Sequence, residues 1–178
     1  MDLNQVSERM VRAIKLDDSL FEEVEHDLSA TSQAGLVVIL SSIAAGVGTG
    51  IMSRIGIIGI FIGAAVALFA WYIWAYIVYF IGVKLMPEAN TKSSPGELLR
   101  TIGFSSAPGI FRLFGFLPIF GGLIAFVSSV WMIVAMVKAV KAALDYTSTI
   151  RAIGVVLAGW FIQAAVVLIA IFMFGGFG

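Results

Sequence analysis

The side chains that could carry out chemistry are few and scattered. The sole histidine, His26, lies between Glu25 and Asp27. This grouping suits a metal or pH-sensing site, or simply the solvated face of a helix, and we favour the solvated face because the surrounding segment is rich in charge. The chain has no cysteine, which excludes disulfides, thiolate metal sites and thiol nucleophiles. The sequence therefore predicts no enzymatic activity, no cofactor and no metal.

Two further patterns could bind a charged ligand. Gly46-x-Gly48-x-Gly50 lies in an apolar segment with no preceding strand, so it does not predict a phosphate-binding loop. Arg112 is the one ionisable side chain that lies well inside an apolar segment, and no carboxylate accompanies it there. An intramembrane arginine can mark a functional site. We favour snorkelling or structural pairing for Arg112 over a functional role.

The elements that must position these groups are long and apolar. Of the 178 residues, 60% are hydrophobic and only 12% are charged, and the mean hydropathy is +1.03. A helix needs about 20 apolar residues to cross the hydrocarbon core of a bilayer. Uncharged stretches of this length or more cover 28–53, 55–83, 113–137 and 152–178. The sequence predicts an all-α, polytopic membrane helical bundle.

We divide the chain into an N-terminal amphipathic helical segment, 1–30, and a transmembrane domain, 31–178. Within the domain, the short polar loop at 52–54 predicts that the first two spans form an antiparallel hairpin. Gly59-x-x-x-Gly63 in the second span predicts a close helix contact, within one chain more readily than between two. The five predicted transmembrane helices are about 33–51, 55–83, 95–117, 123–143 and 150–174.

The third predicted span has the clearest helix-start signal, but its interior favours insertion into a membrane the least. Ser94, Pro95 and Glu97 match a capping box with proline at the first helical position. The span also contains Arg112, a proline and several glycines, which bring its insertion free energy close to zero. Arg100, near the start, can snorkel to the interface. We expect the segment to cross the bilayer only with help from its neighbours.

The first thirty residues are charged, contain eight of the eleven acids, and have no early apolar run, so no cleavable signal peptide is predicted. The region from Asp17 onward predicts an amphipathic helix with one apolar stripe. This stripe is either a face that docks a partner or the side of an interfacial helix that packs against the bundle, and we favour the packed helix. The stripe consists of Leu20, Phe21, Val24 and Leu28.

The basic residues predict the orientation. With five spans, nine lysines and arginines lie on the same side as the N-terminus, and only Arg54 and Arg112 lie on the other. Because basic loops stay in the cytoplasm, this bias predicts an inside N-terminus and an outside C-terminus. If the third span did not cross, the bias would collapse, which argues independently for five spans.

The run ELLRTIGFSSAP, which contains Arg100, is followed by an FxP–Gly-Gly turn. These motifs resemble those of the Yip family, whose members are five-span membrane proteins linked in eukaryotes to Rab GTPases and to transport between endoplasmic reticulum and Golgi. The resemblance covers about Leu16 to Phe174, most of the chain. The matching positions are Gly103, Phe104, Pro108, Pro118, Trp131, Lys138 and Lys141.

This resemblance implies a non-enzymatic adaptor or organiser in membrane trafficking or membrane homeostasis. It implies contacts with membrane lipids, a protein partner at the cytoplasmic face and homo- or hetero-oligomers, and no nucleic acid. The segment before the first span is short and lacks the Asp-Leu-Tyr-Gly-Pro motif of eukaryotic members. We therefore expect a prokaryotic-type member in the cytoplasmic membrane; a eukaryotic member would lie in endoplasmic reticulum or Golgi membranes.

A second interpretation comes from the residues alone. A small channel, transporter or lipid-handling protein would need a cavity between its spans, and Arg112 with nearby Ser105 and Ser106 could line one. A solvent- or lipid-filled cavity reached by Arg112 would favour this interpretation over the adaptor.

Overall fold

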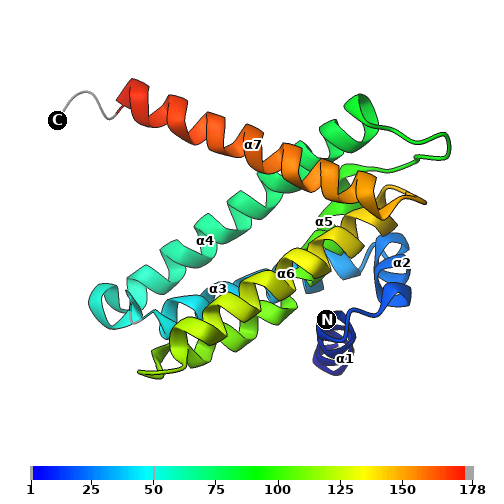
Figure 1. Cartoon of the computed structure of the whole chain (residues 1–178). Coiled ribbons are helices and arrows are strands. Elements are labelled where there is room, and N and C mark those ends of the chain that lie inside the picture. The colour runs from blue at the N-terminus through cyan, green and yellow to red at the C-terminus, as the bar shows by residue number, and fades with distance from the viewer. Residues whose placement is uncertain (1, 50, 175–178) are drawn as a thin grey trace.

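A computed structural model (Figure 1) describes residues 2–49 and 51–174, and the side chains in these ranges except at 51–55, 57, 166–167, 169–171 and 173–174. Gly50 of the glycine pattern lies outside this description. The described residues are helical, without strands, which confirms the all-α prediction. In chain order the elements are α1 (Leu3–Ile14), α2 (Asp18–His26), α3 (Ala30–Gly48), α4 (Ile51–Tyr79), the π-helix η1 (Phe80–Leu85), α5 (Pro95–Ser105), the 3₁₀ helix η2 (Ala107–Phe116), α6 (Gly121–Ala143) and α7 (Thr149–Phe174).

Within the described part of the chain, three helical segments are long and apolar enough to cross a membrane: Ala30–Gly48, Ile58–Leu85 and Gly121–Ala143. These correspond to the first, second and fourth predicted spans. In α7 the stretch Thr149–Ala165, beyond which the side chains are only partly described, is apolar as well. The coarse prediction of an all-α protein with membrane-spanning helices is therefore met by three helices that have the length and composition of a span.

The third predicted span, 95–117, is two helical segments instead of one. Its start is as predicted, because Ser94 Oγ accepts from Glu97 N–H at 3.3 Å and Glu97 Oε2 accepts from Ser94 N–H at 2.9 Å. α5 ends at Ser105, and the 3₁₀ helix η2 continues from Ala107. The break has a local cause, since Pro108 has no N–H for the carbonyl of Phe104 and its ring crowds that carbonyl.

The second predicted span also departs from a simple helix. α4 begins at Ile51, so the predicted loop at 52–54 is helical, and the chain breaks instead at Gly56, whose φ of 62° is open to glycine at little cost. At its other end the helix widens into η1. A β-carbon built on Gly63 would meet no atom of the described residues within 4 Å. The prediction of a close contact within the chain is therefore wrong at Gly63.

α3 runs parallel to the broken pair α5–η2. Going along α3, Ala34 lies against Gly103, Ser41 against Gly109, and Gly48 against Gly115. Both sets of numbers rise together, so the two segments share one direction and stay in contact over the whole length of α3. In Figure 1 these elements and α6 form the lower, closely packed part of the molecule.

α4 and α7 cross and then separate. Gly154 of α7 lies against Met86, and Gly159 lies against the ring of Trp74. Beyond this crossing the two helices diverge (Figure 1). Beyond the crossing, large apolar side chains of both helices are exposed; Phe61 is 71% and Phe161 76% exposed. Such a large apolar surface suits lipid more than water.

α1 and α2 together, residues 3–26, form a cap on one end of the bundle, which we call the cap end. Leu20, Phe21 and Val24 are fully buried in a cluster that includes Ala34 and Phe104. Leu28, the fourth residue of the predicted stripe, is 80% exposed. In this structure the stripe packs against the bundle, so its first three residues are not open to a partner.

Candidate functional site

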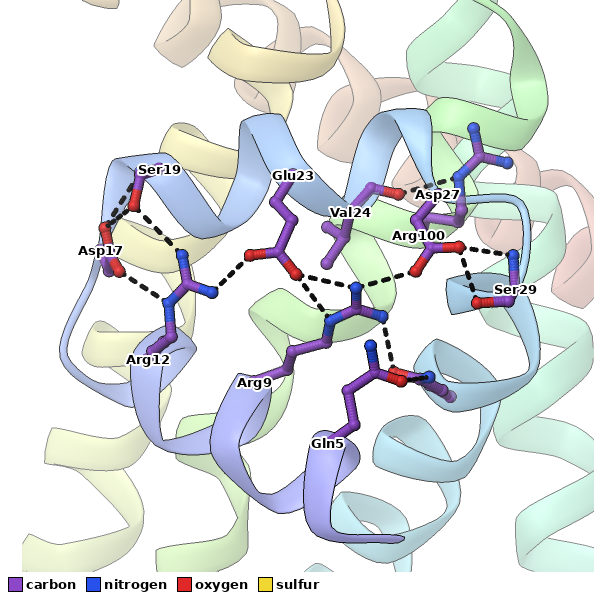
Figure 2. A network of polar contacts seen from close by, with 11 residues as sticks. Gln5, Arg9, Arg12, Asp17, Ser19, Glu23, Val24, Asp27, Ser29 and Arg100 are labelled. Carbon is purple, nitrogen blue, oxygen red and sulfur yellow. Dashed lines mark hydrogen bonds and ion pairs between the residues drawn. The ribbon is translucent and has the colours of Figure 1, made fainter. Parts of the chain in front are cut away.

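Arg9 organises the polar contacts that hold the cap (Figure 2). The side chain is almost completely buried, and its Nη2 lies 2.7 Å from both Glu23 Oε1 and Asp27 Oδ2. Its Nη1 donates to Gln33 Oε1 at 2.9 Å, and Gln33 in turn donates to Gln5 Oε1 at 2.8 Å. One guanidinium thus joins α1, α2 and the first turn of α3.

Arg12 repeats this arrangement nearer to solvent. It donates to Asp17 Oδ2 at 2.9 Å and forms an ion pair with Glu23 Oε2 at 2.5 Å. The hydrogen bond from Arg12, with a further one from Ser19, lowers the pKa of Asp17 to about 2. Burial opposes ionisation of Glu23, but hydrogen bonds from Arg12 and Arg9 outweigh it and lower the pKa of Glu23. Both carboxylates therefore stay charged well into the acid range.

Arg100 fixes the end of α2 from the bundle side. This residue is buried, and its Nε donates to the carbonyl oxygens of Val24 at 2.9 Å and Glu25 at 3.0 Å. A second donor, Nη2, also contacts the Glu25 carbonyl oxygen. The last carbonyls of a helix lack partners within it and carry partial negative charge. Arg100 supplies both the hydrogen bonds and the charge they need.

Glu25 is a buried carboxyl group in an acidic neighbourhood. Its side chain is 4% exposed, and its Oε1 lies 3.2 Å from Nε2 of the exposed His26. Burial first, and then nearby negative charges, raise the pKa of Glu25 to about 8, while Arg100 acts in the opposite direction. The acids that contribute to this are Glu22, Asp145 and Glu97.

The stability of the protein should depend on pH through Glu25. Its pKa is raised from 4.5 to about 8, so between these values the unfolded chain has released a proton that the folded chain still holds. The free energy of unfolding therefore falls as pH rises through this window and levels off above it. Glu25→Gln should remove this slope and raise stability at pH 8 by a few kcal/mol, since a pKa difference of one corresponds to about 1.4 kcal/mol.

Unfolding followed by tryptophan fluorescence at several pH values would measure this effect. Glu8→Gln, at an exposed position on α1, is the matched control and should keep the slope. A Glu25→Gln variant with the wild-type pH profile would show that Glu25 is charged in the folded protein.

Arg112 lines a cavity at the end of the bundle opposite the cap. The cavity has a volume of about 540 Å³, and in it Arg112 Nη2 donates to Ser129 Oγ at 2.8 Å. Thr49 contributes a second hydroxyl, while Ser105 and Ser106 do not line the cavity. Among the residues whose side chains the structure describes, the lining contains no acid and no charged residue besides Arg112; it consists of Ala45, Gly48, Thr49, Arg112, Gly115, Gly121, Gly122, Ala125 and Ser129.

The other residues selected from the sequence fall into three groups, of which the two lysines are described last. Gly103, Phe104 and Pro108 are buried where α5 and η2 meet α3. Toward the far end, Pro118 lies in the turn before α6, and Trp131 stacks on Phe111 with ring centroids 5.7 Å apart. The structure therefore spreads the selected residues along the bundle instead of gathering them into one site.

The two selected lysines lie near the cap. Lys138 Nζ donates to the Leu16 carbonyl oxygen at 3.1 Å and to Asp18 Oδ1 at 2.7 Å, which joins α6 to the cap. Lys141, one turn further along, borders a polar basin described below.

Several groups that hold the structure together were not selected from the sequence. Arg9 and Gln33 are 24 residues apart, and no local pattern predicts their contact. Tyr146 Oη lies within hydrogen-bonding distance of the Gly82 and Met86 carbonyl oxygens, at 2.9 and 2.6 Å. The sequence offers one signal for the Arg9–Gln33 contact. Gln33 is a polar residue near the start of an apolar helix, and a buried polar group needs a hydrogen-bond partner.

Comparisons with known protein families, with curated proteins and with solved structures give no match.

Proposed function

We propose that this chain is a non-enzymatic integral membrane protein of the Yip type, an adaptor or organiser that presents its cap to a protein partner at the cytoplasmic face. The observation that best supports this proposal is the rigid attachment of the cap. Arg9, Arg100 and Lys138 connect α1 and α2 to three different bundle helices. A surface held so firmly needs little further ordering when it binds a partner.

We propose that five helical segments cross the bilayer, with the cap inside and the C-terminus outside. Besides the three apolar helices, α5–η2 follows α3 over its full length. If α3 crosses, then α5–η2 crosses beside it, and α7 returns from the cap end. The membrane is the cytoplasmic membrane if the source is a prokaryote. The basic loops at the cap end agree with this orientation.

The cap offers an exposed apolar face of its own, separate from the buried stripe. Leu3 is 65% and Val11 47% exposed, and both lie on α1. Replacing Leu3 and Val11 by serine removes this face without touching the core. Removal of the whole cap would be a poorer test, because it would uncover the apolar cluster around Phe104.

The test is a cross-linking pull-down from native membranes with the full-length chain. We expect a soluble partner whose recovery falls at least about fivefold in the Leu3→Ser/Val11→Ser variant. Ile119→Ser is the matched control, because Ile119 is 84% exposed at the opposite end of the bundle. Recovery that is equal in both variants, or recovery of lipids and copies of the chain alone, would contradict an adaptor role for the cap.

The cavity around Arg112 supports a second candidate, a small channel, transporter or lipid-handling protein. Within the described residues the partner given to Arg112 is the Ser129 hydroxyl, which carries no charge, so the guanidinium could attract an anion or a lipid phosphate. In reconstituted vesicles, Arg112→Leu should then reduce flux by about tenfold or more, while Arg151→Leu, at the cap end, should not. Absence of flux in the unmodified protein, together with greater stability of Arg112→Leu, would exclude this candidate.

A further inference from the structure

A polar basin of about 920 Å³ lies where the cap meets the end of α6. It differs from the Arg112 cavity in being surrounded by charge of both signs. Its walls come from α2, from the loop after η1, and from the last turn of α6 with the residues that follow. The basin is lined by Asp18, Glu22, Ala89, Asn90, Lys92, Lys138, Lys141, Ala142, Asp145 and Tyr146.

The charges that line the basin are only partly neutralised within the chain. Lys138 is paired with Asp18 at 2.7 Å. Within the described part of the chain, the structure gives no ion pair to Lys92 or Lys141, nor to the acids Glu22 and Asp145. Two basic and two acidic groups are therefore available together, and their sum is zero. A ligand that carries both a negative and a positive group would match them.

The basin lies at the level where the apolar helices end. α6 ends at Ala143, beside the basin, and Tyr146 holds the loop after η1 against this end. In the proposed orientation this is the cytoplasmic surface of the bilayer, where phospholipid headgroups are concentrated. Lysines at this depth attract lipid phosphates.

We propose that this basin binds the phosphoethanolamine headgroup of a phospholipid from the cytoplasmic leaflet, with its phosphate at Lys92 and Lys141 and its ammonium at Glu22 and Asp145. The proposal rests on the proposed membrane orientation and deepens the proposed function by adding a lipid to it. It assigns no chemical step to the protein, because binding alone is inferred.

The lining favours ethanolamine over the other common headgroups. A primary ammonium donates hydrogen bonds to carboxylates, which strengthens the ion pair. The quaternary ammonium of choline cannot donate such bonds and is usually bound in an aromatic cage. Tyr146 is the one aromatic residue of the lining, and its hydroxyl is already engaged. A phosphatidylglycerol headgroup would leave both acids facing its negative charge.

The test uses the purified full-length protein in nanodiscs that contain equal amounts of phosphatidylethanolamine, phosphatidylcholine and phosphatidylglycerol. Native mass spectrometry then reports which lipids remain bound. We expect retention of phosphatidylethanolamine to exceed that of each other lipid by about tenfold. Lys92→Ala/Lys141→Ala should reduce this preference to about twofold or less, whereas Lys84→Ala, at the same end but outside the lining, should keep it.

Asp145→Asn tests the acidic half of the site separately. Asp145 has a φ of 52°, a conformation that asparagine also tolerates, so this variant removes the charge without adding backbone strain. It should weaken binding of phosphatidylethanolamine more than binding of phosphatidylglycerol. If the double lysine variant does not fold, Lys92→Ala alone, at an exposed loop position, still tests the basic half.

Three results would overturn the proposal. These are equal retention of all three lipids, preferential retention of phosphatidylglycerol, and complete displacement of lipid by free O-phosphoethanolamine, which would identify a soluble ligand instead. The measurement needs no protein partner, so failure to find a partner for the cap leaves it unaffected. Conversely, loss of the lipid preference with retention of a cap partner would reject the lipid site alone.

Discussion

Gly103→Leu is expected to prevent folding of the bundle, and Gly103→Ala to lower its free energy of unfolding by about 3 kcal/mol. A β-carbon at Gly103 would lie 2.6 Å from the β-carbon of Ala34 and 3.1 Å from its α-carbon. These atoms belong to the backbone or are attached directly to it, so no side-chain rotation can relieve the overlap. α3 and α5 would have to separate, which would open the cluster around Phe104.

Gly63→Ala is the matched control for this prediction, since it makes the same change in another apolar helix, at a position where no atom of the described residues lies within 4 Å. It should be neutral, or slightly stabilising because alanine favours a helix by up to about 1 kcal/mol over glycine. Thermal unfolding of the detergent-solubilised protein would measure both variants. Equal stability of Gly103→Ala and the unmodified protein would show that α3 and α5 do not pack as described.

Arg9→Met is expected to lower the free energy of unfolding by about 3 kcal/mol and to release α1 from the bundle. Methionine fills much of the same space but leaves the buried oxygen of Gln33 without its donor. Glu23 and Asp27 would also lose a charge that now lies 2.7 Å away. Leaving one partner of a buried polar group unsatisfied costs more than the net value of the interaction.

Arg12→Met provides the control for Arg9, because it removes an arginine from the same helix and the same network. Its side chain is 26% exposed against 5% for Arg9, so its ion pairs are solvated and should contribute less than about 1 kcal/mol. Unfolding measurements, together with proteolysis between α1 and α2, would compare the two. A larger effect for Arg12→Met than for Arg9→Met would contradict the burial described.

Acid should weaken the same network. The pKa of Asp27 is lowered first by a hydrogen bond from Ser29 and then by one from Arg9, and the pKa of Glu23 is lowered as well. A group whose pKa is lowered by folding contributes stability at pH values above its pKa in the unfolded chain. This stability is lost as pH falls through its pKa in the folded protein. This trend is opposite to that of Glu25, so stability should be greatest near pH 5.

The start of α5 and the apolar stripe of α2 could both be predicted from short-range patterns. A capping box depends on residues three positions apart, and Ser94 and Glu97 form it as expected. The stripe of Leu20, Phe21 and Val24 depends on helical periodicity, and these residues are buried. The same periodicity does not say what covers a stripe, and here the bundle covers it.

Two features could not be predicted in the same way: the break in the third predicted span, and the side of α4 on which Gly63 lies relative to the other helices. Pro108 and the nearby glycines were visible as helix breakers, yet whether neighbours would hold an α-helix through them depends on packing. Gly59-x-x-x-Gly63 has the spacing of a contact face, but α4 turns that face away from its own chain at Gly63. Spacing describes one helix and contains no information about the position of the next.

Length, hydropathy and caps within the sequence were enough to establish an all-helical chain with membrane-spanning helices, because each depends on neighbouring residues and on their transfer from water. The contact of Arg9 with Gln33, the burial of Glu25 and the basin between α2 and α6 depend on tertiary structure. Lys138 and Asp18 are 120 residues apart, and only the folded chain brings them to 2.7 Å. The charge left over in that basin is a property of the folded assembly of helices, since chain order alone places its residues in three separate segments.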